Sequence, residues 1–189
     1  MRPALVSVFS DQIYAQRLHQ TTAVTHESSE KSQQITLILH TPNAVCRRRV
    51  DSFSTKELET LEWIDQYGGG AFFDVGANVG LYSLYYEKFY SDQVYAFEPS
   101  VFNLGILAKN THVNSMSDQV NIAPTPLSSK DQLAALRLGA PDEGGAMSTF
   151  FGATFRRYGL ALPEQTSYRM PGLTLDTMLA SGMIPCRWP

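Results

Sequence analysis

Short apolar runs and longer amphipathic runs alternate through the middle of the chain. The order is strand 71–75, helix 81–90, strand 93–99, helix 101–114 and strand 120–127. Strands that alternate with helices of this length indicate a parallel sheet with right-handed crossover connections. The pattern therefore predicts an α/β fold whose ligand site lies at the carboxyl ends of the strands.

The pattern before this core is weaker. Residues 1–34 are mostly polar, and we expect them to form an N-terminal extension in which 25–34, "THESSEKSQQ", is a solvated connector. The apolar run "ITLILH" from Ile35 and the β-favouring stretch 44–50 flank the turn residues "TPN". This arrangement predicts a small hairpin.

A helix is predicted over "STKELETLEWIDQYGGG", the stretch that leads into the first core strand. Ser54 is placed as its N-cap with Glu57 three residues later, which is the spacing of a capping box. Leu58, Leu61 and Ile64 recur at helical spacing, and the glycines that follow end the helix.

The turn after the first core strand, "DVGANVG", carries the most specific chemistry. Gly76 and Gly80 lack a Cβ, so they let the chain turn sharply and let backbone N–H groups approach a ligand. The helix that follows presents unpaired N–H groups and a partial positive charge. We therefore expect a ligand with an anionic group against this turn.

Three nucleotide-containing ligands compete for the turn. ATP or GTP use is disfavoured because Leu81 and Tyr82 stand where a P-loop has its lysine and hydroxyl residue. A dinucleotide is disfavoured because Asn78 replaces the middle glycine and Asp74 would repel a pyrophosphate. S-adenosylmethionine has no phosphate and carries positive charge, so Asp74 favours it.

Glu98 gives an independent indication of a nucleoside. It ends the second core strand about twenty residues after the glycine turn, where a carboxylate can accept hydrogen bonds from both ribose hydroxyls. The turn and this Glu-Pro pair together indicate a nucleoside-containing cofactor.

Composition narrows the class of protein. The chain has 189 residues, 43% of them hydrophobic, and a net charge of −3. These values fit one globular domain and not a surface that tracks nucleic-acid phosphates.

The triplet Arg47 to Arg49 is either a solvated face or a contact for an anionic substrate. Cys46 and Cys186 have no metal-site spacing, and the apolar start is too short for a signal or membrane span. We expect a cytoplasmic protein with no metal.

Several segments together resemble the FkbM family of S-adenosylmethionine-dependent methyltransferases. They are "TPNAVCRRRVDSFSTKELETLEWID", "FFDVGANVGLYSLYYEK", "VYAFEPS", "NLGILAKN" and Asn114, and the resemblance covers roughly residues 36–179. It implies a Rossmann-like class I methyltransferase fold and O-methylation of a hydroxyl on a sugar, polyketide-like or other small molecule.

The resemblance also implies the residues that hold S-adenosyl-L-methionine. The turn residues and the residues after the second and third strands would be Asp74, Gly76, Ala77, Asn78, Gly80, Tyr82, Ser83, Glu98, Leu127 and Ser128. Tyr82 and Ser83 would lie near the methionine part, Glu98 at the ribose, and Leu127 with Ser128 at the adenine. No catalytic base is identified. Gly144 and Gly145, with the flanking "APDEGGAMS", are expected to form a mobile free loop.

The chain departs from the family after "LTLDTMLASG", where a fourth strand with a Lys-Ile-Asp-Val-Glu-Gly motif is expected and "MIPCRWP" stands instead. We therefore expect 35–189 to be a partial methyltransferase domain whose C-terminal half is incomplete. Two functions stay open: a methyltransferase that acts on a small-molecule hydroxyl acceptor, and an inactive truncated fragment that at most binds the cofactor. Nucleic-acid and membrane partners are not expected, and self-association stays open.

Overall fold

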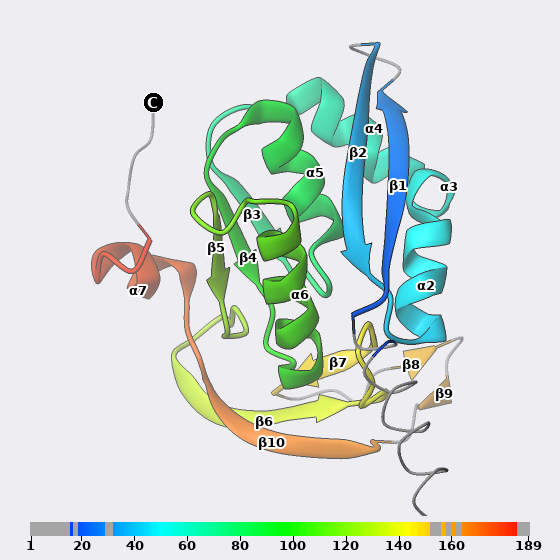
Figure 1. Cartoon of the computed structure of the whole chain (residues 1–189). Coiled ribbons are helices and arrows are strands. Elements are labelled where there is room, and N and C mark those ends of the chain that lie inside the picture. Colours follow the sequence, from blue (N-terminus) through cyan, green and yellow to red (C-terminus); the bar gives the residue numbers. More distant parts are fainter. Residues whose placement is uncertain are drawn as a thin grey trace, which may run out of the picture.

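The computed structural model describes residues 16, 19–28, 32–151, 156–157, 160–161 and 164–184 (Figure 1). Its helices are α2 (Ala44–Asp51), α3 (Phe53–Lys56), α4 (Leu58–Tyr67), α5 (Leu81–Tyr90), α6 (Val101–Val113) and α7 (Leu175–Ala180). Its strands are β1 (Thr21–Ser28), β2 (Gln33–His40), β3 (Phe72–Val75), β4 (Val94–Phe97), β5 (Val120–Ala123), β6 (Gln132–Leu138), β7 (Ser148–Phe150), β8 (Arg156–Arg157), β9 (Leu160–Ala161) and β10 (Thr166–Gly172).

The predicted parallel sheet is confirmed. Its strand order is β3-β4-β5, with Phe72 opposite Val94 and Val94 opposite Val120. Helices α5 and α6 make the two crossover connections. The fold is therefore α/β, with a three-stranded parallel sheet flanked by helices.

The main core lies between the sheet and the β1-β2 hairpin, with α5 in the middle (Figure 1). Leu84 and Tyr85 of α5 are fully buried there, together with Leu37 of β2 and Ala96 of β4. The opposite face of the sheet is covered by α7, whose Met178 packs in a second apolar cluster with aromatic side chains of β3 and β4.

The N-terminal hairpin differs from the prediction. Its strands are β1 and β2, paired antiparallel from Thr21 opposite His40 to Ser28 opposite Gln33. The expected solvated connector is thus largely strand, although residues 29–31 lie outside the described residues. His26 is buried because its ring packs edge-on against Phe53 and Tyr85.

The expected second hairpin strand, 44–50, is a helix instead. Asn43 is the N-cap of α2, and its side-chain oxygen accepts hydrogen bonds from the N–H groups of Val45 and Cys46. The "TPN" sequence therefore starts a helix and does not turn a hairpin, because a capping asparagine satisfies two of the unpaired N–H groups.

The single helix predicted after Ser54 is broken at Glu57. Its backbone leaves the helical region with φ −133° and ψ 53°, so α3 and α4 are separate and Ser54 caps neither of them. The Glu57 carboxylate does not reach back to the backbone, because it accepts a hydrogen bond of 2.7 Å from the Tyr82 hydroxyl and lies 3.2 Å from Lys56 Nζ.

The outer edge of β2 is closed by asparagine side chains of α6 and its C-cap. Asn110 accepts a hydrogen bond from the N–H of His40, and Asn114 pairs with both the N–H and the carbonyl of Ile38. Asn110 also donates to the carbonyl of Val79 and is fully buried. One side chain therefore joins the hairpin, α6 and the glycine turn.

A second three-stranded sheet, of order β10-β6-β7, is antiparallel and was not predicted. It lies beyond the carboxyl ends of the parallel strands (Figure 1). Tyr168 of β10 attaches it to the segment after β4, because its hydroxyl donates to the carbonyl of Pro99 and accepts from the N–H of Val101. The space between the two sheets is the setting of the candidate site.

Candidate functional site

The turn after β3 needs residues that tolerate left-handed backbone. Gly76, Asn78 and Gly80 have φ values of 85°, 54° and 88°. A Cβ on Gly80 would clash with Cδ1 of the buried Leu107 of α6, so a larger residue would force that side chain to shift. The prediction that both glycines are needed for the turn is therefore supported by backbone geometry.

Three backbone N–H groups of the turn are not free for a ligand, contrary to our expectation. Those of Gly76 and Ala77 donate to the carbonyl of Phe97, and that of Asn78 donates to Glu98. The turn is anchored to the end of β4, and buried N–H groups need such partners. A ligand at this site must be held mainly by side chains.

Glu98 organises this anchoring. Its side chain is buried, and Oε2 accepts from the N–H of Asn78 while Oε1 accepts from the N–H of Ser100, both at 2.7 Å. Burial raises the pKa of the carboxyl, and the hydrogen bonds from Ser100 and Asn78 oppose that rise. The side chain of Asn103 is a third donor, so the carboxylate keeps capacity for about one further hydrogen bond.

Asp74 braces the start of α5. The hydroxyl of Ser83 donates to its Oδ2 at 2.6 Å, and the backbone of Ser83 also donates to the carboxylate. Burial raises the pKa of Asp74, and both hydrogen bonds oppose this rise. Desolvation therefore disfavours the charged form of the Asp74 carboxyl, and the two hydrogen bonds from Ser83 favour it.

Replacement of Asp74 by asparagine should flatten the pH dependence of stability. A raised pKa in the folded state means that wild-type stability falls as pH rises from the ordinary carboxyl value through the raised one. Asp74→Asn keeps an acceptor for Ser83 but lacks this fall. Urea unfolding at pH 4, 5, 6 and 7 measures the effect, and parallel profiles for the two proteins would contradict it.

The segment Glu143 to Ala146, here called the bridging segment, is held by side chains and is not the free loop that we expected. Asn78 and Asn103 both donate to the carbonyl of Gly145, and Asn103 accepts from the N–H of Gly144. From the other side, Asn43 donates to Glu143, and Arg49 Nε donates to the Gly144 carbonyl at 2.7 Å. The segment is thus tied to the turn, α2 and α6.

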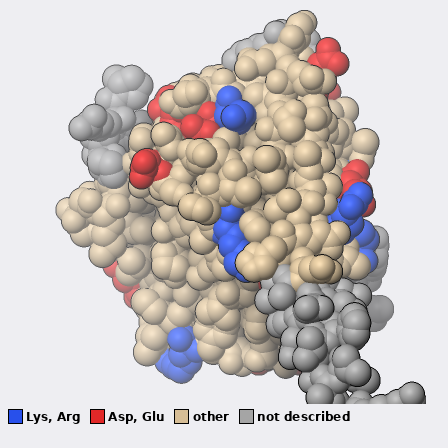
Figure 2. Space-filling model, viewed as in Figure 1, with Lys and Arg blue, Asp and Glu red and all other residues tan. Residues whose placement is uncertain are grey.

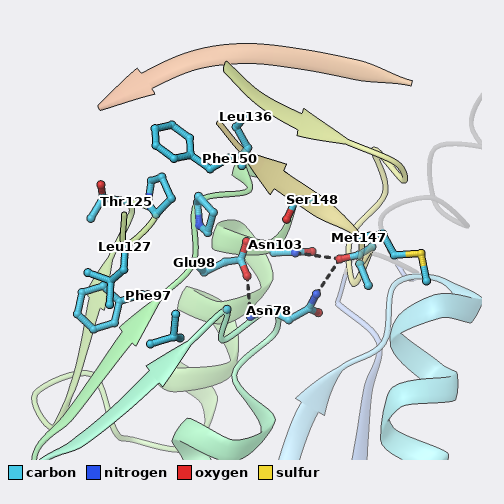
Figure 3. Close-up of a pocket in the computed structure, with 16 residues that line it drawn as sticks. Asn78, Phe97, Glu98, Asn103, Thr125, Leu127, Leu136, Met147, Ser148 and Phe150 are labelled. Carbon is cyan, nitrogen blue, oxygen red and sulfur yellow. Dashed lines mark hydrogen bonds between the residues drawn. The ribbon is translucent and has the colours of Figure 1, made fainter. Parts of the chain in front are cut away.

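A cavity of about 310 Å³ lies between the turn and the antiparallel sheet (Figure 3). The figure shows Glu98 and Asn78 facing each other near the strand ends, with Leu136 and Phe150 on the opposite wall. Its lining consists of Val75, Gly76, Asn78, Phe97, Glu98, Pro99, Asn103, Thr125, Pro126, Leu127, Leu136, Gly145, Ala146, Met147, Ser148 and Phe150. An apolar lining with a few polar groups at this volume is typical of a small-molecule site.

One buried acceptor in the cavity wall has no partner. Asn78 donates through Nδ2 to Gly145, but its Oδ1 is buried and makes no hydrogen bond to any described residue. Buried polar atoms in folded proteins are nearly always paired. This oxygen is closed off from the cavity, so a ligand donor could reach it only if the turn or the bridging segment shifts.

The structure brings only some of the predicted residues to this cavity. Those that line it are Gly76, Asn78, Glu98 and Leu127. Among the others, Asp74 and Ser83 bind each other, and Gly80 and Ala77 are buried in the turn. Tyr82 faces a separate small hollow with Glu57, and Ser128 donates its N–H to the carbonyl of Leu173.

Sequence reasoning missed Asn103 and the far wall. Asn103 is buried in the first turn of α6 and contributes to the cavity wall. An amide in the otherwise apolar stretch "VFNLGIL" was the available signal. The far wall comes from β6 and β7, and the apolar stretch "LAALRL" at 133–138 was the available signal for β6.

Three further observations concern metal binding, membrane-spanning helices and surface charge. Within the described part of the chain, no group of three or more His, Cys, Asp and Glu residues is placed to hold a metal ion. No described helix is long and apolar enough to cross a membrane. Figure 2 shows small, separated groups of Lys and Arg on the visible face, with acidic side chains among them.

Comparisons with protein-family models, with curated proteins and with solved structures found no significant match to this chain.

Proposed function

We propose that this protein is an S-adenosylmethionine-dependent methyltransferase of the Rossmann-like class I fold, acting on the hydroxyl oxygen of a small molecule. The observation that carries the proposal is the Glu98 carboxylate in the cavity at the strand ends, with Asn78 of the glycine turn bound to it. The resemblance of the turn and the Glu-Pro strand end to the FkbM family supports the same cofactor.

The residues present fit the nucleoside part of this cofactor. Glu98 can accept a hydrogen bond from a ribose hydroxyl through the acceptor capacity that Asn78, Ser100 and Asn103 leave unused. The apolar side chains of Leu127 and Phe97 line the cavity on the β5 side, where an adenine ring would be shielded from water. When bound, the cofactor supplies an electrophilic methyl group.

The contribution of the chain to methyl transfer would be alignment and exclusion of water. The bridging segment closes one side of the cavity, and its hydrogen bonds to Asn78 and Asn103 hold it there. Holding two reactants in line can supply about 7–11 kcal/mol of the barrier reduction in favourable systems. A side chain that takes the hydroxyl proton is not assigned.

Binding of S-adenosylhomocysteine tests the cofactor directly. At a ligand concentration one hundred times Kd, binding should stabilise the fold by about 2.7 kcal/mol. This corresponds to a rise of roughly 5–11 °C in melting temperature for a chain of this size. NAD and ATP at the same concentration should give no rise, and stabilisation by NAD instead would favour an oxidoreductase over a methyltransferase.

A matched pair of variants tests whether the ligand binds in this cavity. Asn78→Gly keeps the left-handed backbone but removes the side chain that lines the cavity and holds Gly145, so it should weaken S-adenosylhomocysteine binding about tenfold or more. Asn121→Ala removes an exposed amide of β5 that does not line the cavity and should leave Kd within twofold. Equal affinities for Asn78→Gly and wild type would place the ligand elsewhere. Binding without methyl transfer would identify an inactive cofactor-binding protein.

A further inference from the structure

A second cavity, of about 700 Å³, lies on the other side of the bridging segment. Gly145 and Ala146 line both cavities, so the bridging segment forms a common wall. The opposite wall of the second cavity comes from α2 and α3. Its volume is within the range of small-molecule sites.

The charged lining of this second cavity is cationic on balance. Arg48, Arg49 and Lys56 face Asp51 and Asp142. The Asp51 carboxylate already binds the guanidinium of Arg47, Nε to Oδ1 at 2.8 Å, and Arg47 does not line the cavity. Because Glu57 offsets Lys56 in the same way, the positive balance rests on Arg48 and Arg49 against Asp142.

The two arginines of the lining retain free hydrogen-bonding capacity. Among the described residues, no ion pair includes Arg48 or Arg49. Arg49 is half-buried and uses Nε on the carbonyl of Gly144, which leaves the other N–H groups of its guanidinium without a described partner. A planar guanidinium held in place in this way is suited to a carboxylate or phosphate.

Lys56 adds a third cation, partly neutralised. Its Nζ lies 3.2 Å from the Glu57 carboxylate, which also accepts the hydroxyl of Tyr82. The break between α3 and α4 at Glu57 places this group at the end of the cavity wall formed by α3. Two arginines and a lysine on one concave wall differ from the scattered cations of an ordinary solvated face.

We propose that this cavity binds the anionic group of the acceptor, so that the substrate is a hydroxyl compound carrying a carboxylate or phosphate. The identification of the bound molecule as the methyl acceptor rests on the proposed methyltransferase function. The anion site itself rests only on the residues that line the cavity. The two cavities share Gly145 and Ala146 as a wall, so an acceptor anchored by Arg48 and Arg49 has to pass the edge of the bridging segment to bring its hydroxyl to the cofactor cavity. The same chemistry could come from the carboxylate of the cofactor itself, and the test separates the two sources.

Inorganic phosphate is the first probe, measured by thermal shift and calorimetry at fixed ionic strength without cofactor. Wild type should bind it saturably, and the double variant Arg48→Gln, Lys56→Gln should lose at least tenfold in affinity. Lys88→Gln removes an exposed charge of α5 that does not line the cavity, so it should change affinity by less than twofold. No saturable binding, or an equal loss in Lys88→Gln, would overturn the proposal.

The second arm compares S-adenosylhomocysteine with methylthioadenosine, which lacks the amino-acid carboxylate. Neither affinity should change by more than twofold in the Arg48→Gln, Lys56→Gln variant. A selective loss of S-adenosylhomocysteine binding would assign the cations to the cofactor and overturn the acceptor site. Failure of wild type to bind either nucleoside while phosphate still binds would instead remove the proposed function and leave the anion site.

Discussion

Glu98→Ala should destabilise the fold and abolish nucleoside binding together. The carboxylate is the hydrogen-bond acceptor for the buried N–H groups of Asn78 and Ser100, so its removal leaves both without a partner. Each such group costs about 1–3 kcal/mol, partly offset because a buried charge is also removed. Urea unfolding should therefore show a net loss of roughly 1–4 kcal/mol.

Glu98→Gln separates the two roles of this side chain. The amide keeps the shape and one acceptor oxygen, but its NH₂ group faces one of the two backbone donors. We expect stability between those of wild type and Glu98→Ala, with S-adenosylhomocysteine affinity at least tenfold below wild type. Unchanged stability in Glu98→Ala would mean that the hydrogen bonds to Asn78 and Ser100 do not hold the turn.

Asn110→Ala should be among the most damaging single changes outside the cavity. The substitution leaves the N–H of His40 and the carbonyl of Val79 without their partner. At about 1–3 kcal/mol each, the two groups predict a loss of roughly 2–6 kcal/mol in the free energy of unfolding. Chemical unfolding measures this loss. The better helix propensity of alanine opposes part of it.

Asn114→Ala is the matched control for Asn110. It removes the same kind of side chain one helical turn later, where the hydrogen bonds to Ile38 are exposed to water. Water can replace these bonds, so the expected loss is below about 1 kcal/mol. Similar losses for the two variants would show that burial at Asn110 does not decide the cost.

The central elements β3, α5, β4, α6 and β5 could be predicted because their information is local. Each has its own hydrophobic period, and the glycine turn is demanded by backbone geometry at Gly76 and Gly80. The position of Glu98 at the end of β4 follows from the same periodicity. Its use as an anchor for backbone N–H groups does not, because those donors are fixed only by the folded turn.

The parts that sequence reasoning missed depend on contacts distant along the chain. Strand β1 is polar in sequence, yet His26 is buried there by Phe53 and Tyr85, which come from two different helices. Asn43 is equally suited to a turn or a helix N-cap, and only the fold chooses between them. The bridging segment was mistaken for a free loop because Asn78, Asn103 and Arg49 lie far from it in sequence.

The asparagine contacts along β2 also bear on association between chains. A strand at the edge of a sheet exposes N–H and carbonyl groups that can pair with a strand from another molecule. On β2, the groups of Ile38 and the N–H of His40 are already occupied by Asn114 and Asn110. These two amides act in place of a third strand, and they protect this part of the hairpin edge from intermolecular β-sheet growth.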